Sequence, residues 1–318
     1  MIKPENIHKP VMVEEVLEGF GFGNIAPLKS QGVVYKKKII DATVGAGGHA
    51  VEIIKRDGFV LGIDADSEMI KIAGKNLQLA CPTGNFDDHF ILVNGNFRKL
   101  DKISKDAKVG DVDGILFDLG ISSFHLDFDT RGFSFNNPEN PLDMRLSPQT
   151  EAVTGSMLLN SLPKNALIDL FSLVLTRNLA LDLAHKVIEK RTFKPITKVG
   201  DFLEIIKESN IRKKKSKFIG TVEESTLPFL ALRMAVNSEL ENLEEALNKS
   251  VYLIKKGGRL EVISFHSGED RIVKNTFKRL VGEGKGILIT KKPKVPTIEE
   301  IRGNPRSRSS KLRIFQKI

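Results

Sequence analysis

A glycine-rich stretch at residues 38–51, KIIDATVGAGGHAV, constrains the fold of this chain more than any other feature. The apolar run from Ile39 to Val44 predicts a short buried strand, and a helical pattern begins at His49. The turn between them contains three glycines, Gly45, Gly47 and Gly48. This order forms the nucleotide pocket of open α/β sheets, because glycine lets a ligand approach the backbone and the helix start leaves N–H groups unpaired.

An acidic residue closes the next expected strand. Residues 59–63 form a second apolar run, which ends at Asp64. An acid at this position can accept hydrogen bonds from both hydroxyls of a ribose, so the two signals together predict an adenosine-cofactor site. These residues do not determine which cofactor binds, because the spacing Gly45-x-Gly47-x-x-Ala50 also fits a dinucleotide-binding motif. The alternative is a structural turn beside a solvated aspartate.

The remaining apolar runs predict a doubly wound, mostly parallel α/β sheet that is interrupted by a helical domain. Further strands are expected at 90–93, 112–119, 258–265, 287–291 and 311–316, the last two as an antiparallel hairpin. Helices are expected at 7–20, 50–55, 158–190, 199–207, 225–254 and from Ser67, and a long functional loop at 120–144. We therefore expect a cofactor-binding domain made of 1–126 and 225–318, and an inserted helical domain at 127–224.

The charge of the chain is strongly positive and unevenly distributed. The net charge is +9 and the pI is about 9.4. One cluster lies at residues 291–318, and a second consists of Arg212, Lys213, Lys214, Lys215 and Lys217. A polyanionic partner such as nucleic acid accounts for both clusters most simply, the alternative being a set of solvated surface lysines.

The sequence also disfavours several classes of protein. No apolar run approaches the roughly 18 residues that a membrane helix needs. Residues 1–16 lack the apolar core of a signal peptide, so we expect a cytoplasmic location. Cys81 is the only cysteine, which excludes an internal disulfide and a cysteine cluster for zinc, and we expect no metal.

Seven motifs follow one another along the chain: 118–123 (DLGISS), 131–135 (RGFSF), 141–145 (PLDMR), 235–240 (AVNSEL), 257–260 (GGRL), 264–274 (SFHSGEDRIVK) and 304–310 (NPRSRSS). In kind and order they resemble the ribosomal small-subunit RNA methyltransferase H family, also called MraW, over nearly the full length. The resemblance implies a class I S-adenosylmethionine-dependent methyltransferase with an inserted all-helical domain for substrate recognition. It also implies methylation of the exocyclic N4 of a cytidine in the decoding region of 16S rRNA, either naked or in the small ribosomal subunit. A homodimer is left open.

The same resemblance assigns the cofactor contacts residue by residue. They fall on Gly47, Gly48 and His49 in the glycine turn, Asp64 for the ribose, Phe97 after the third strand, Asp118 after the fourth, and His125, where the family commonly has Gln. The stretches 175–180 and 222–229 and Gly268 depart from the family's pattern. These departures put RNA docking through the inserted domain in question, whereas the cofactor site is intact.

The implied reaction needs acceptors for the hydrogens of an amine that is a poor nucleophile, because the lone pair of cytosine N4 is delocalised into the ring. Asp118, Ser122 and Ser123 follow the fourth expected strand, at the sheet edge where the cofactor would bind. Asn237 and His266 are further candidates. Asn237 either pins the long loop or contacts the base, and His266 is either a satisfied structural histidine or a proton carrier.

Cations outside the cofactor site are candidates for contacts with RNA phosphates: Arg145, Arg212, Lys213, Lys214, Arg306 and Arg308. Arg145 has an alternative role in an ion pair with Asp143. Two other functions stay open. A nicotinamide-dependent oxidoreductase would use the glycine motif and Asp64, although no hydride-transfer group is visible. A catalytically inactive RNA-binding assembly factor would fit the departures in the inserted domain.

Overall fold

The structure, a computed structural model, describes residues 10–22, 36–81, 86–211, 214–215, 221–222 and 225–318. It divides into two compact units, which we describe separately. The first consists of Met1–Ser122 and Leu240–Ile318, and the second of Ser123–Glu239. No helix in the described part of the chain is both long enough and apolar enough to cross a membrane.

The first unit is built on a seven-stranded sheet with the order β3-β2-β1-β4-β7-β9-β8. Its strands are β1 (Lys38–Asp41), β2 (Phe59–Asp64), β3 (Phe90–Asn94), β4 (Val112–Asp118), β7 (Ile254–Ser264), β8 (Gly286–Leu288) and β9 (Lys311–Lys317). The first five strands are parallel, and β9 runs antiparallel to both of its neighbours, β7 and β8. This topology confirms the doubly wound class I fold with an antiparallel C-terminal hairpin.

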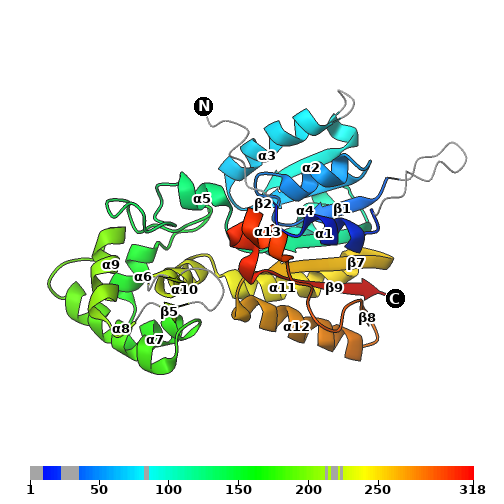
Figure 1. Cartoon of the computed structure of the whole chain (residues 1–318). Helices are drawn as coiled ribbons and strands as arrows, with labels where there is room; N and C mark the ends of the chain where they lie inside the picture. Colours follow the sequence, from blue (N-terminus) through cyan, green and yellow to red (C-terminus); the bar gives the residue numbers. More distant parts are fainter. Residues whose placement is uncertain (1–9, 23–35, 82–85, 212–213, 216–220, 223–224) are drawn as a thin grey trace, which may run out of the picture. The chain divides into compact units, whose positions relative to one another are not determined.

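Helices cover both faces of the sheet (Figure 1). One face packs against α1 (Val13–Gly19), α2 (Gly48–Ile54) and α3 (Ser67–Ala80). The other face packs against α4 (Leu100–Asp106), α11 (Glu239–Leu253) and α12 (Ser267–Gly282). The shorter elements of the unit are α13 (Ile298–Gly303) and the 3₁₀ helices η2 (Phe86–Asp88), η3 (Phe97–Lys99) and η4 (Pro305–Ser309). Because both faces are covered, the central strands β1, β2, β4 and β7 are largely buried and read as apolar runs in the sequence.

The sequence pattern predicts the strands better than it predicts their ends and the short helices. The strand expected through Val44 ends at Asp41, because the N–H of Thr43 turns to the Asp41 side chain, 3.3 Å from Oδ1. Helices α4, α12 and α13 were not among the expected elements. Helix α4 has only seven residues, and α12 begins after His266, which is not among the residue types that mark a helix start.

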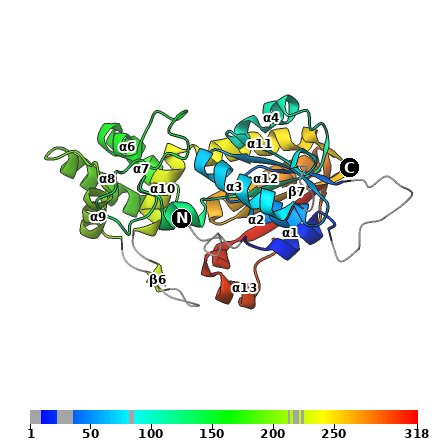
Figure 2. The same ribbon diagram turned by 90° about the horizontal axis from the view of Figure 1, so that it is seen from above.

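The second unit is mainly helical (Figure 2). It contains α5 (Ser123–Asp127), α6 (Gly155–Ser161), α7 (Lys164–Ser172), α8 (Arg177–Arg191), α9 (Val199–Glu208) and α10 (Thr226–Val236). The helix expected at 158–190 is therefore broken, first at Pro163, which precedes α7. The unit is also not entirely helical, because β5 (Lys214–Lys215) and β6 (Thr221–Val222) pair antiparallel. Helix α10, assigned by sequence to the cofactor-binding domain, clusters with this unit.

A chain of aromatic rings forms the core of the second unit. The ring centroid of Phe202 in α9 lies 6.1 Å from Phe171 in α7 and 5.2 Å from Phe229 in α10. The ring of Phe135 continues the chain, 5.7 Å from Phe229. Phe171 and Phe202 are fully buried. Residues far apart in the sequence therefore hold α7, α9 and α10 together through one cluster.

Candidate functional site

Three acidic side chains stand at the carboxyl ends of neighbouring strands in the first unit. Asp41 ends β1, Asp64 ends β2 and Asp118 ends β4, and β1 lies between the other two strands. Because the strands are parallel, their carboxyl ends meet at one edge of the sheet. Burial raises the pKa of both Asp41 and Asp118; in addition, the charge of Asp64 raises the pKa of Asp41 and that of Asp41 raises the pKa of Asp118, so the three acids are electrostatically coupled.

The glycine turn between β1 and α2 closes over this edge. Gly45 has a φ of 52° and Gly47, the N-cap of α2, a φ of 89°, a region that favours glycine. At Gly48 the reason for glycine is space, because an added Cβ would lie 2.9 Å from the Cβ of Pro10. The N–H of Gly45 donates to Oδ2 of Asp64 at 2.9 Å, which ties the turn to the end of β2.

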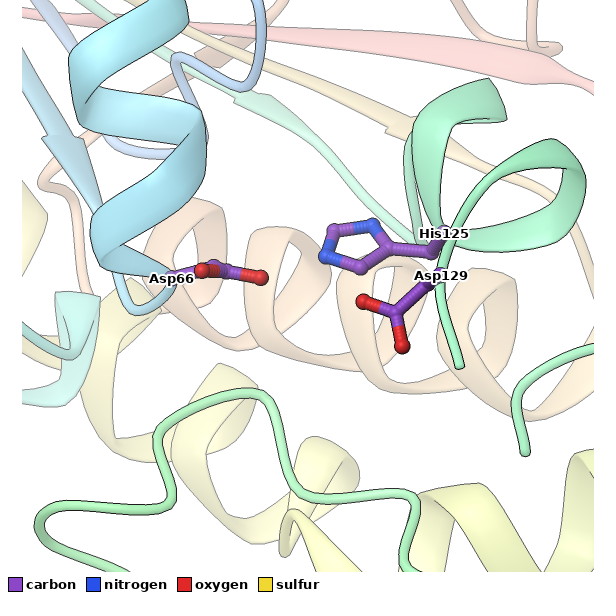
Figure 3. A group of neighbouring side chains, drawn as sticks. All are labelled: Asp66, His125 and Asp129. Carbon is purple, nitrogen blue, oxygen red and sulfur yellow. The ribbon is translucent and has the colours of Figure 1, made fainter. Parts of the chain in front are cut away.

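Asp64 holds two backbone segments at once. Besides Gly45, it accepts a hydrogen bond from the N–H of Asp66, 2.8 Å from Oδ1. Asp66 is buried and caps α3 by accepting from the N–H of Glu68 at 2.9 Å (Figure 3). The Asp64 carboxylate is therefore fixed between the glycine turn and the start of α3, and its contact with a ribose stays a prediction.

Asp118, whose side chain is only 13% exposed, is incompletely paired. Its backbone N–H donates to Oγ1 of Thr43 at 2.7 Å, and its Oδ2 lies 3.5 Å from Nδ1 of His49. Its Oδ1 is buried and has no hydrogen-bond partner within the protein. Burial raises the pKa of Asp118 well above its ordinary value, and the charges of Asp41 and Glu269 raise it further. A buried acceptor without a partner is unusual and needs an explanation, and at this edge of the sheet a ligand would supply one.

His49 connects two parts of the first unit through its ring nitrogens. Its side chain is buried, with Nε2 2.9 Å from the carbonyl oxygen of Val11 and Nδ1 facing Asp118. The ring thus connects the start of α1 to the Asp118 carboxylate. A direct contact between the His49 side chain and a cofactor stays a prediction.

Asp41 is a site residue that sequence reasoning missed. Its side chain is buried, and burial raises its pKa to about 7, against the lowering effect of the Thr43 N–H and with a further increase from Asp64. Its position gave a usable signal, because it is a third acid at the end of an apolar run. The neighbouring apolar residues instead led to its assignment as part of the strand interior.

His266 and Glu269 follow β7 and form a reciprocal cap on α12. The N–H of Glu269 donates to Nδ1 of His266 at 3.4 Å, and Oε2 of Glu269 accepts from the N–H groups of Phe265 at 2.8 Å and His266 at 3.2 Å. Glu269 is buried, and its charge contributes to the raised pKa of Asp118. The cap is the structural role that the sequence left as one alternative, whereas a role for His266 as a proton carrier stays a prediction.

Two further candidates of the first unit make packing contacts. The ring of Phe97 packs edge-on against Phe117, with 5.6 Å between centroids and an interplanar angle of 86°. The hydroxyl of Ser122 lies 3.2 Å from Sδ of Met69 in α3. A role for Phe97 as an adenine platform, and for Ser122 as an acceptor, stays a prediction.

The other candidates of this kind belong to the second unit. Ser123 begins α5, and His125 in the same helix is buried, 5.1 Å from Phe133 between ring centroids and beside Asp129 (Figure 3). Asn237 ends α10, where its Oδ1 accepts from the N–H of Leu146 at 2.8 Å and its Nδ2 donates to the carbonyl of Met144 at 2.8 Å. For Asn237 the structure shows the first of the two alternatives, the pinning of the long loop.

The predicted RNA-contacting cations have different environments. Arg145 pairs with Asp143 through Nε–Oδ1 at 2.7 Å and Nη2–Oδ2 at 2.8 Å, which is the ion-pair alternative. Arg306 and Arg308 are exposed on η4. Arg212 and Lys213 lie outside the described residues, and of Lys214 only its place in β5 is described.

Comparison with known proteins identifies relatives over the whole chain. A family model described as the MraW methylase family matches residues 5–318. The ribosomal RNA small subunit methyltransferase H of Dictyoglomus thermophilum is 41% identical, over 100% of this chain and 99% of the relative. The enzyme of the same name from Thermotoga neapolitana is 39% identical, over 98% of this chain and 97% of the relative.

A solved structure, an rRNA methylase from Streptococcus thermophilus, resembles this chain with a TM-score of 0.39 at 10% identity, covering 89% of this chain and 87% of that one. A likeness of this size adds nothing to the assignment, which depends on the family model and on the two sequence relatives.

Proposed function

The chain belongs to the MraW methylase family, and on this premise we propose that it methylates the exocyclic N4 of a cytidine in the decoding region of 16S rRNA, with S-adenosylmethionine as donor. The observation that carries the proposal is the buried, unpaired Oδ1 of Asp118 at the end of β4. It supplies an acceptor at the carboxyl edge of the sheet, where the cofactor is proposed to bind.

The residues present fit the donor. S-Adenosylmethionine would supply a methyl group on a positively charged sulfur, and Asp41, Asp64 and Asp118 offer the opposite charge in their ionised forms. Burial raises the pKa of Asp41 and Asp118, so their negative charge increases with pH. The glycine turn allows close approach to its backbone, and Asp64, which is tied to that turn through Gly45, is the residue proposed to hold the ribose. Opposite charges inside a partly dehydrated site interact much more strongly than in water.

The acceptor amine is activated by the chain's own oxygen atoms. Oδ1 of Asp118 accepts a hydrogen bond from the N4 amino group, which localises the nitrogen lone pair toward the methyl group. Bound S-adenosylmethionine would supply the methyl group and leave as the neutral thioether, and the methylated nitrogen would then carry one proton too many. Because burial raises the pKa of Asp118, its carboxylate is a competent acceptor for that proton. Ser122 and Ser123 are the further candidates.

The second unit is assigned the recognition of the rRNA, and the first unit the chemistry. The substrate of the enzyme is the rRNA itself or the small ribosomal subunit, and the enzyme acts in the cytoplasm. Family membership argues against the nicotinamide-dependent oxidoreductase. The inactive assembly factor is the remaining alternative, because the departures at 175–180 and 222–229 lie in the second unit. Self-association as a homodimer stays a prediction.

One experiment tests the proposal and separates it from both alternatives. Purified protein is incubated with labelled S-adenosylmethionine and small-subunit rRNA or subunits from a strain that lacks the endogenous enzyme, and the nucleosides are analysed by mass spectrometry. We expect N4-methylcytidine. An unmethylated product would favour the assembly factor, and binding of NAD in place of S-adenosylmethionine would favour the oxidoreductase.

Replacing Asp64 with alanine is expected to weaken donor binding by about 10- to 100-fold, because hydrogen bonds to a charged group contribute about 1.5–3 kcal/mol. Isothermal titration with S-adenosylmethionine measures the loss. Asp111→Ala, at an exposed aspartate before β4, is the matched control and should bind normally. An unchanged affinity in a folded Asp64→Ala protein would refute the site assignment.

Donor affinity is expected to increase between pH 6 and pH 8. The pKa of Asp41 is raised to about 7, so its carboxylate is protonated at the lower pH and carries its charge at the higher one. Only the charged form attracts a sulfonium, which gives at most about a tenfold change per pH unit below the pKa. In Asp41→Asn the part of the pH dependence centred near 7 should disappear. A pH dependence identical to that of the wild type would exclude Asp41 as its source.

A further inference from the structure

A small pocket lies on the first unit between α12, β8 and β9, outside the candidate cofactor site. Its volume is about 170 Å³, and we call it the α12–β8 pocket. Its polar lining consists of Lys274 and Lys278 of α12, Thr290 and Lys291 of the segment after β8, and Arg313 of β9. Four of these five side chains are cations, so the pocket has the chemistry of an anion site.

The positive charge in the pocket is not balanced by the protein. Within the part of the chain that the structure describes, Lys274, Lys278 and Lys291 are exposed and have no carboxylate within ion-pair distance. Lys274 and Lys278 are four residues apart on one face of α12, and like charges at this spacing destabilise a helix. Repulsion between the two lysines therefore destabilises α12 at this position, and a bound anion would reduce it.

The nearest acid on α12 is already occupied. Asp270 binds Arg313 through Oδ1–Nε at 2.7 Å and Oδ2–Nη2 at 3.2 Å, and Lys311 approaches the same carboxylate at 3.5 Å. Arg313 and Lys311 hold the pKa of Asp270 below its ordinary value despite its partial burial, so it stays charged. This ion pair fixes Arg313 at the pocket wall and leaves the three lysines uncompensated.

A hydroxyl group in the same pocket also lacks a partner. Oγ1 of Thr290 is buried and makes no hydrogen bond. Leaving such a group unpaired is unfavourable, so native proteins seldom do so without a reason. A phosphate oxygen bound between the lysines would be an acceptor for this hydroxyl.

A second hollow on the other side of α12 provides a contrast. It is lined by Asn248, Tyr252, Arg279 and Lys285, but both of its cations pair with Glu283. Its charge is therefore satisfied within the protein. The α12–β8 pocket differs in combining unpaired cations with an unpaired hydroxyl.

We propose that the α12–β8 pocket binds one phosphate group of the RNA backbone, an inference that rests on the proposed function. The ligand is a backbone phosphate and not a nucleotide, because the only ring in the wall, Phe277, is 1% exposed and offers no surface for a base to stack on. Such a contact positions the RNA and does not read its sequence. Through this contact the first unit would bind the RNA independently of the second unit.

The test is a triple substitution, Lys274→Ala with Lys278→Ala and Lys291→Ala. RNA affinity is measured at several salt concentrations, because each phosphate contact with single-stranded RNA contributes a slope of about 0.7 in a plot of log affinity against log salt. We expect a slope smaller by about that amount and an affinity several-fold lower at low salt, with unchanged binding of S-adenosylmethionine. Thr290→Val should reduce RNA affinity without changing the slope.

The matched control is Lys102→Ala with Lys105→Ala and Lys256→Ala, three exposed lysines of the same unit with no ion pair in the described structure. Equal slopes in the two triple variants would overturn the proposal. If the wild type bound inorganic phosphate or a mononucleotide tightly, and the triple variant of the pocket lysines did not, the pocket would be reassigned to a free ligand. Wild-type protein that neither binds nor methylates the RNA would instead refute the proposed function.

Discussion

Replacing Asp118 with asparagine is expected to lower the rate of methyl transfer by about 10²- to 10⁴-fold, the usual contribution of a positioned proton acceptor. The amide keeps the shape of the carboxylate and can still face His49. However, it replaces an acceptor oxygen with an NH₂ donor and cannot take up a proton. Single-turnover transfer from labelled S-adenosylmethionine to rRNA measures this step without the contribution of product release.

Donor affinity must be titrated separately, because Asp118 is also a predicted cofactor contact. The pH dependence gives a second readout. Since burial raises the pKa of Asp118, the wild-type rate should rise with pH as the carboxylate ionises, and this rise should vanish in Asp118→Asn. Asp113→Asn is the control, at the opposite end of β4, where Asp113 accepts from the N–H of Lys38 at 2.8 Å. A turnover close to that of the wild type would exclude Asp118 as the acceptor.

Burial of an acid does not by itself identify the site. Glu261 in β7 is fully buried, neither of its carboxylate oxygens has a hydrogen-bond partner, and burial raises its pKa well above the ordinary value. It lies in mid-strand next to Gly19 of α1, where no other strand ends. Asp118 differs because it ends its strand beside two other strand-end acids, at the edge that an open α/β sheet uses for ligands.

The sheet could be predicted from the sequence because each of its strands is marked by a pattern of neighbouring residues. A buried parallel strand is an apolar run, and the glycine turn has a spacing that few other structures need. Asp64 and Asp118 were found because each closes such a run. Asp41 was missed because residues 42–44 continue the apolar pattern, although the backbone has already left the strand at Thr43.

Side-chain partners could not be predicted in the same way, because they come from distant parts of the chain. The contact of His49 with the carbonyl of Val11 spans 38 residues, and that of Asn237 with Met144 spans 93. The sequence could offer only alternatives for such residues. The contact between Glu269 and His266 is different, because it joins residues only three apart and an acid three residues after a helix cap is a recognisable sequence signal. This signal was obscured because histidine is an unusual cap residue.

Phe202→Ala is expected to destabilise the second unit by about 3–5 kcal/mol, the range for removing a buried phenylalanine together with the cavity that it leaves. Phe202 is fully buried and its ring lies between those of Phe171 and Phe229. Because these three side chains come from α9, α7 and α10, the loss should loosen all three helices together. Hydrogen exchange resolved by peptide, compared between α7–α10 and the sheet, measures it directly.

Phe193→Ala is the matched control, because Phe193 follows α8 in the same unit and is 84% exposed. It should change stability by no more than about 0.5 kcal/mol. If the second unit recognises the RNA, Phe202→Ala should lower RNA affinity and methylation while S-adenosylmethionine still binds to the first unit. Protection of α7, α9 and α10 equal to that of the wild type would show that the aromatic chain does not hold these helices together. Normal methylation by a protein whose second unit is loosened would show that substrate recognition lies elsewhere.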